Sequence, residues 1–113
     1  METNKPPCMR RMNDPTAAAW IRGQCGDTME VYLTIRDGMI EDATFFTDGC
    51  EATMICGSAV AELVRGKSID EVLAVSPRQV IDCAGDLPAD HIHCAILAVN
   101  TLHKAIADYL LQY

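Results

Sequence analysis

The sequence predicts an α+β domain in which a small antiparallel sheet of about three strands is covered by helices. Three observations support this fold class. Strand-like alternation of apolar and polar residues is confined to the chain before Gly49, the dipeptide Asp37-Gly38 divides it like a hairpin turn, and helical periodicity takes over after Gly49. Because strands come first and helices follow, the order is typical of an α+β domain.

The strand prediction rests on a period of two residues. Between residues 29 and 36, four apolar side chains alternate with polar or amphipathic ones, as in a half-buried strand. Asp37-Gly38 predicts a tight turn, and residues 39–47 (MIEDATFFT) form the returning strand. A preceding strand over roughly residues 17–24 would complete the sheet.

Capping signals divide the rest of the chain into helices. The first helix follows Gly49 and is expected to end at Gly66, while Ser68 and Ser76 begin two further segments. The last helix is expected to start with Asp90 as its N-cap. One apolar stripe should run along it to the C-terminus, made of Ile92, Ile96, Val99, Leu102, Ile106 and Tyr109.

A chain of 113 residues is long enough to bury one hydrophobic core. Residues 1–14 contain prolines and no periodicity, so they are expected to form a flexible N-terminal tail that orders only against a partner. Cys8 in this tail has no evident partner. Residues 15–113 then form the single domain.

The net charge of −7 argues against nucleic acid or an anionic membrane as a partner, because the basic residues are scattered and form no stripe. No apolar run suggests a membrane span, and the first residues lack the apolar region of a secretory signal. We therefore expect a cytoplasmic protein. In that compartment thiols stay reduced, so the six cysteines indicate metal ligands or reactive thiols rather than disulfides.

Three cysteines lie at the ends of predicted elements. Cys25 precedes Asp27 by two residues, Cys50 opens a helix directly after a strand, and Cys94 lies in the first turn of the last helix. The positive end of a helix dipole favours thiolate over thiol, which should make Cys50 and Cys94 better nucleophiles and metal ligands. Loops that meet at one edge of the sheet could bring these thiols and the Asp27 carboxylate together.

The remaining candidates are weaker. Cys56 and Cys83 lie among apolar residues and are interpreted as core residues. His91 and His93 are two residues apart and cannot both face the Cys94 side of a regular helix. His93 is the better candidate because it adjoins Cys94.

Five segments, in order along the chain, resemble the IscU-type iron-sulfur cluster scaffold family, which includes the N-terminal domain of NifU. They are CGDTM, IEDATFFTDGC, VRGKSIDEV, LPADHIHCAILA and AIADY, and the resemblance runs from about residue 23 to residue 109. It implies that the three cluster cysteines are Cys25, Cys50 and Cys94. It also places the family's aspartate and histidine at Asp27 and His93.

The resemblance implies a scaffold protein rather than an enzyme. A transient 2Fe-2S cluster would be built from iron and from sulfur that a cysteine desulfurase delivers as a persulfide, with Cys94 as the acceptor. Iron and electron donors and apo-protein acceptors would be the other partners. Three thiolates bind iron strongly, whereas the carboxylate of Asp27, or the imidazole of His93 in another state, leaves more readily. Such a ligand set suits a temporary holder, and zinc could occupy it in the isolated protein.

The sequence departs from the family in places that change the expected partners. The chaperone-recognition segment Leu-Pro-Pro-Val-Lys is replaced by Leu87-Pro88-Ala89-Asp90-His91, so release by the family's Hsp70-type chaperone is not expected. Most of the family's N-terminal helix is missing. Cys56 stands where the family often has serine, which leaves a sulfur-relay role open.

Two alternatives use the same residues. A zinc-dependent sulfurtransferase of the SufU type would hold zinc with the same three thiols and carboxylate. Such proteins carry an insertion between the second and third cysteines, and residues 50–94 show no evident extra segment, which favours the scaffold. A purely structural metal would need a closed site, whereas these ligands are expected at element ends that a partner can reach.

Overall fold

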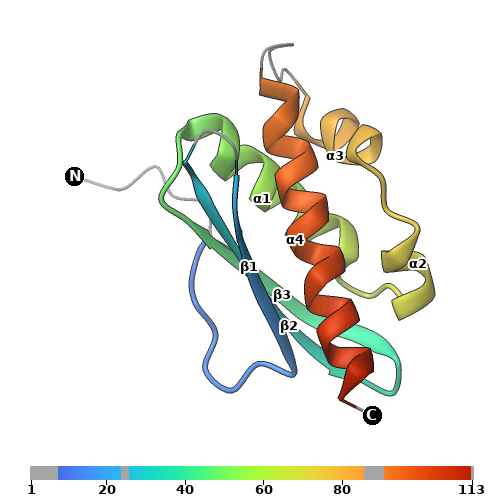
Figure 1. The fold of residues 1–113 in the computed structure, drawn as a ribbon. Helices are drawn as coiled ribbons and strands as arrows, with labels where there is room; N and C mark the ends of the chain where they lie inside the picture. Colours follow the sequence, from blue (N-terminus) through green and yellow to red (C-terminus); the bar gives the residue numbers. More distant parts are fainter. Residues whose placement is uncertain (1–7, 24–25, 86–90, 113) are drawn as a thin grey trace.

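The computed structural model describes residues 8–23, 26–85 and 91–112, which form a three-stranded antiparallel sheet packed against helices (Figure 1). The α+β class predicted from the sequence is confirmed, with every strand preceding every helix. The strands are β1 (Ala17–Arg22), β2 (Thr28–Arg36) and β3 (Met39–Thr47), and the helices are α1 (Glu51–Val64), α2 (Ile69–Leu73), α3 (Pro77–Ala84) and α4 (Ile92–Leu111).

The sheet has the order β1-β2-β3, with β2 in the centre. The predicted turn joins β2 to β3, where Asp37 and Gly38 both adopt positive φ angles, 54° and 74°. These angles suit a two-residue hairpin turn that follows the twist of the strands. Burial alternates along β2 as its sequence predicts, so one face of the sheet is turned toward the helices.

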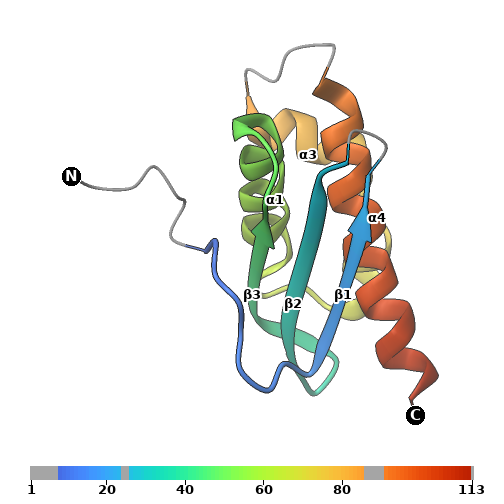
Figure 2. The same cartoon turned by 60° about the vertical axis from the view of Figure 1, so that its left-hand side comes forward.

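Helices α1 and α4 cover that face and α3 packs against both of them (Figures 1 and 2). The core lies between this layer and the sheet, and Phe45, Leu33 and Leu102 are among its fully buried side chains. Helix α1 approaches β3 so closely that a Cβ atom on Gly57 would collide with the Phe45 ring. The predicted capping boxes at Ser68 and Ser76 are both present and begin α2 and α3.

Helix α4 differs in part from its prediction. It begins at Ile92, and the predicted N-cap Asp90 lies outside the described residues. The predicted stripe is wrong at its start, because Ile92 and Ile96 are 40% and 43% exposed. The buried face is centred on small residues, Ala95, Ala98 and Ala105, which allow close packing but contribute little to an apolar stripe in the sequence.

By length and composition alone, α4 could cross a membrane. The apolar runs in the sequence had predicted no such span. Half of the window that meets this test is buried inside the protein, and a core helix meets it equally well. The packing of α4 against β1, β2 and α1 accounts for its apolar character.

Residues 8–16, here called the N-terminal segment, pack on the sheet. Phe45 N–H donates to the Cys8 carbonyl at 3.1 Å, which covers the outer edge of β3, and Thr16 N–H donates to the Leu33 carbonyl at 2.9 Å. Between these anchors the segment crosses the face of the sheet that the helices leave open (Figure 2). The lack of periodicity predicted a flexible tail here, whereas residues 8–14 lie in contact with the domain. Residues 1–7 of that predicted tail lie outside the described residues.

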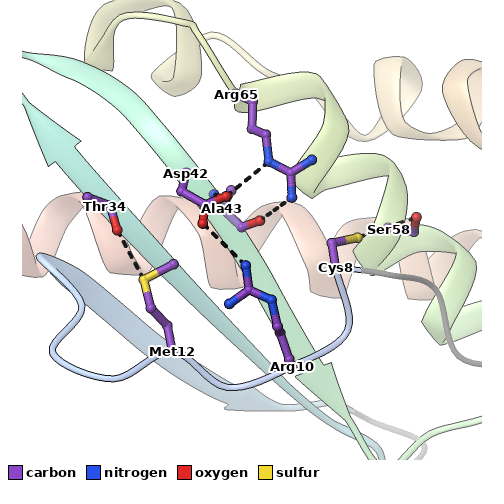
Figure 3. A network of polar contacts seen from close by, with 8 residues as sticks. All are labelled: Cys8, Arg10, Met12, Thr34, Asp42, Ala43, Ser58 and Arg65. Carbon is purple, nitrogen blue, oxygen red and sulfur yellow. Dashed lines mark hydrogen bonds and ion pairs between the residues drawn. The ribbon is translucent and has the colours of Figure 1, made fainter.

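Side chains hold the N-terminal segment to the sheet. Arg10 pairs with Asp42, which also accepts a hydrogen bond from Arg65, and Cys8 Sγ lies 3.7 Å from the Ser58 hydroxyl (Figure 3). Arg11 pairs with Glu30 at 2.9 Å and stacks over the Phe46 ring at 4.1 Å. These contacts join residues far apart in the sequence, which is why the segment's own pattern gives no sign of them.

Candidate functional site

Three separate parts of the chain meet at one end of the sheet. They are the connection from β1 to β2, the corner between β3 and α1, and the start of α4, all at the top of Figures 1 and 2. Thr28 N–H donates to the Asp48 side chain at 2.9 Å, which ties the start of β2 to the β3–α1 corner. This end of the molecule carries four of the residues that the sequence singled out, Asp27, Cys50, His93 and Cys94.

Cys50 is the N-cap residue of α1, and its side chain is exposed. The backbone N–H of Thr53, and next the Thr53 hydroxyl, lower the pKa of the Cys50 thiol below its ordinary value. Burial and the Asp27 carboxylate oppose this effect. The direction agrees with the prediction that a helix N-terminus favours the thiolate at this position.

Asp27 is held in a tight connection before β2. Its carbonyl accepts a hydrogen bond of 2.7 Å from Gly23 N–H, and Gly26 takes a φ of 90°, a conformation that favours glycine. The Asp27 carboxylate accepts a hydrogen bond of 3.0 Å from the Thr53 hydroxyl. This contact connects the β1–β2 connection to helix α1.

The Thr53 hydroxyl also contacts two of the predicted thiols. Thr53 Oγ1 lies 3.6 Å from Cys50 Sγ and 3.4 Å from Cys94 Sγ. Thr53 is fully buried, so a single hydroxyl joins Asp27, Cys50 and Cys94. Thr53 is not among the site residues predicted from the sequence. The available signal was a hydroxyl residue three positions after Cys50 on the buried face of an apolar helix.

Gly49 has a spatial role at this corner. A Cβ atom there would lie 2.7 Å from Asp27 Oδ2 and 2.9 Å from Thr53 Oγ1, closer than real Cβ atoms approach other groups. The glycine is therefore needed because the Asp27 carboxylate occupies the space of a side chain. Gly49 is not among the described glycines with a positive φ, so its backbone conformation does not account for it.

Cys94 lies in the first turn of α4 and is 1% exposed. His93 Nε2 lies 3.7 Å from Cys94 Sγ, and the His91 ring stacks on His93 with centroids 6.1 Å apart. Cys94 lines a cavity of about 270 Å³ together with Asp27, Thr53, His93, Ile96 and Leu97. A small reactant entering this cavity would meet a thiol, a carboxylate and an imidazole.

The structure brings together four of the five predicted site residues, namely Asp27, Cys50, His93 and Cys94. Cys25 lies outside the described residues. Within the described ranges, no three metal-ligating side chains are close enough to hold one ion as they stand. Two soft thiols and a hard carboxylate nevertheless share one hydroxyl at an open cavity, and this donor set suits iron or zinc.

The other described cysteines lie in three different environments. Cys56 is fully buried, as expected for a core residue, and burial raises the pKa of its thiol to about 12. Cys83 was predicted to be buried and is exposed, because α3 fully buries only Val80. Cys8, at the start of the N-terminal segment, is buried, with its Sγ 3.7 Å from the Ser58 hydroxyl on α1.

A family model described as the NifU-like N-terminal domain matches residues 7–113 of this chain. The iron-sulfur cluster assembly scaffold protein IscU of Escherichia coli (strain K12) is 43% identical over 86 residues, which make up 75% of this chain and 66% of that protein. The scaffold protein IscU 1 of Archaeoglobus fulgidus is 40% identical over 85 residues, which make up 75% of this chain and 56% of that protein. The match thus spans less than two thirds of either relative.

Among solved structures, the N-terminal part of a nitrogen-fixing NifU-like protein from Brucella abortus is similar to this chain, with a TM-score of 0.74. The similarity covers 95% of this chain and 88% of that one at 21% sequence identity. At this identity the likeness supports the fold alone. It agrees with the α+β arrangement described above.

Proposed function

The chain belongs to the NifU-like N-terminal domain family, and we propose that it is a scaffold for assembling a 2Fe-2S cluster and passing it to apo-proteins. The observation that carries the proposal is the meeting of Asp27, Cys50 and Cys94 on one buried hydroxyl beside an open cavity. The IscU relatives, which are named as scaffolds, support the same function.

In this proposal the cluster is cargo, and Cys25, Asp27, Cys50 and Cys94 hold it. Thiolates bind iron strongly and covalently, while the harder carboxylate oxygen bonds more weakly to cluster iron. Asp27 is therefore the ligand that leaves first when the thiol of an acceptor protein approaches. His93 takes its place in one state, since its ring already lies beside Cys94.

Sulfur reaches the site by exchange at Cys94. The Cys94 thiolate attacks the terminal sulfur of a persulfide on a cysteine desulfurase, a new S–S bond forms on Cys94, and the donor leaves as a thiolate. The proton lost from Cys94 goes to solvent or to the His93 ring. The cavity beside Cys94 gives the donor sulfur a place to approach this thiol.

The transferred sulfur has the oxidation level of elemental sulfur. Each atom needs two electrons to become the sulfide of a cluster, so an electron donor and an iron source are required in addition to the desulfurase. Because the thiols must stay reduced for this chemistry, the cytoplasm is the proposed compartment. An Hsp70-type chaperone is not proposed as a partner, since residues 87–91 lack the family's recognition motif.

Anaerobic reconstitution with ferrous iron, cysteine, a cysteine desulfurase and a reductant tests this function. A scaffold should gain iron and acid-labile sulfide in equal amounts, develop a visible 2Fe-2S spectrum and then load an apo-ferredoxin. Retention of zinc without sulfide, together with sulfur transfer and no cluster, would instead indicate a sulfurtransferase of the SufU type.

A further inference from the structure

The packing of helix α1 does not require a hydroxyl group at Thr53. Helix α1 is otherwise buried through Cys56, Gly57, Ala59, Val60, Ala61 and Val64, and Thr53 places a hydroxyl on the same fully buried face. Burying a hydroxyl costs free energy unless it is hydrogen-bonded. Here its partners are Asp27 and two thiols from different parts of the chain.

The hydrogen-bonding capacity of a hydroxyl limits which of these contacts it can make as a donor. It has one proton to donate and two lone pairs to accept with. An ionised carboxylate can only accept, so the proton of Thr53 is directed to Asp27 Oδ2, 3.0 Å away. Cys50 Sγ and Cys94 Sγ lie 3.6 Å and 3.4 Å from the same oxygen, and in their thiol forms they can donate to its two lone pairs.

We propose that Thr53 is a positioning residue that holds the Asp27 carboxylate in place near the thiols of Cys50 and Cys94 before metal arrives. The Thr53 hydrogen bond uses Oδ2, and no hydrogen bond to Oδ1 occurs among the described residues, which leaves Oδ1 available to a metal. Thr53 then continues to donate its hydrogen bond to Oδ2 while Oδ1 binds the metal. A second group that orients a ligating carboxylate in this way strengthens metal binding.

The surroundings of Asp27 explain why this one contact matters. Apart from the bond to Thr53, the described hydrogen bonds of the β1–β2 connection are Gly23 N–H to Asp27 O and Gly26 N–H to Gly23 O, which involve only the backbone. Thr53, in contrast, is fixed in the first turn of a long helix. The absence of a side chain at Gly49 leaves the carboxylate room to reach the hydroxyl.

This inference rests on the proposed function only in taking Asp27, Cys50 and Cys94 as metal ligands. It is tested by anaerobic titration of the metal-free protein with Co²⁺, followed by the thiolate-to-cobalt charge-transfer band and the visible d–d bands. The variants are Thr53→Val, which keeps the shape of the side chain without its hydroxyl, and Thr53→Ser, which keeps the hydroxyl. Thr53→Ala serves as a second variant without the hydroxyl if Thr53→Val does not fold.

We expect Thr53→Val to weaken Co²⁺ binding roughly 10–100-fold, as for other groups that orient a ligand. Thr53→Ser should keep the affinity and spectrum of the parent. Thr101→Val is the matched control, because Thr101 is also fully buried and donates at 2.8 Å to Leu97 O within its own helix. This control should leave Co²⁺ binding unchanged.

A double-mutant cycle separates positioning from general packing. If Thr53 acts through the carboxylate, Thr53→Val should weaken Co²⁺ binding less in an Asp27→Ala background than in the parent. Equal effects in both backgrounds, equal losses for Ser and Val, or the parent's affinity in Thr53→Val would each overturn the inference. Failure of the parent itself to show a thiolate-to-cobalt band would count against the proposed ligands instead.

Discussion

At the scale of single residues, the site depends on the absence of a side chain at Gly49. The Asp27 carboxylate fills the space beside Gly49 and accepts a hydrogen bond from Thr53 there. A glycine in the sequence does not show whether it is needed for a backbone turn or for the close approach of another group. The structure shows that close approach is the reason here.

Replacing Gly49 with alanine should therefore affect metal binding more than folding. The new Cβ would lie 2.7 Å from Asp27 Oδ2, so the carboxylate must swing away. Because Asp27 is on a surface connection, we expect the melting temperature to stay close to that of the parent while the Co²⁺ affinity falls. Titration and thermal unfolding of the same sample check this, and unchanged Co²⁺ affinity would contradict the assignment.

The cysteines offer a second prediction at this scale. Cys50→Ser or Cys94→Ser should prevent a stable reconstituted cluster, because an alcohol is a far poorer iron ligand than a thiolate. Cys56→Ser should retain the cluster, since Cys56 is a fully buried core residue. It should instead lower the stability by about 1–3 kcal/mol through a buried hydroxyl that lacks a partner. Loss of the cluster in Cys56→Ser alone would show that the ligand assignment is wrong.

At the scale of elements, predictions from local signals were confirmed. The Asp37-Gly38 turn and the capping boxes at Ser68 and Ser76 involve residues within three positions of each other, so the sequence displays them directly. The orientation of α4 depends instead on what it packs against. Its buried face follows small alanines, and the sequence pattern overestimated the burial of Ile92 and Ile96.

In the candidate site too, local features could be predicted from the sequence and tertiary contacts could not. The cysteines at helix starts could be found from the sequence, because helix boundaries are local. Thr53 stands out in the sequence only as a hydroxyl near Cys50, and its role could not be predicted because Asp27 and Cys94 come from other parts of the fold. The N-terminal segment was missed for a similar reason, since its ion pairs reach strands far along the chain.

The attachment of the N-terminal segment predicts a pH dependence. The hydrogen bond from Arg11 is the main cause of the lowered pKa of Glu30, opposed by burial. A lowered carboxyl pKa means that the stabilisation is present above the pKa of the unfolded chain and is lost as the pH falls through that of the folded protein. Arg11→Ala should therefore be less stable than the parent near neutral pH, and the difference should shrink in acid.

Urea unfolding of both proteins at several pH values measures this difference. Arg36→Ala is the control, because Arg36 pairs with Glu41 in an exposed ion pair that contributes little to stability. A part of the Arg11 effect should persist in acid through the contact with the Phe46 ring. A difference that grows as the pH falls would contradict this account of the segment.

At the scale of the whole molecule, folding creates the site. Asp27, Cys50 and Cys94 belong to three parts of the chain that meet only when the sheet and helices have assembled. A metal that binds this arrangement therefore binds the folded state in preference to the unfolded one. Metal binding and stability are then linked.

Zinc should consequently raise the melting temperature of the metal-free protein. Free Zn²⁺ at 100 times its dissociation constant adds about 2.7 kcal/mol to the stability. For a domain of this size, that corresponds to a rise of roughly 10 °C or more. Asp27→Ala and Cys50→Ser should reduce the rise, because each removes a proposed ligand. Cys83→Ser should keep it, since Cys83 is an exposed thiol on α3 and not a proposed ligand. Thermal unfolding with Zn²⁺ and again after chelation measures the effect, and equal shifts in all four proteins would place the zinc elsewhere.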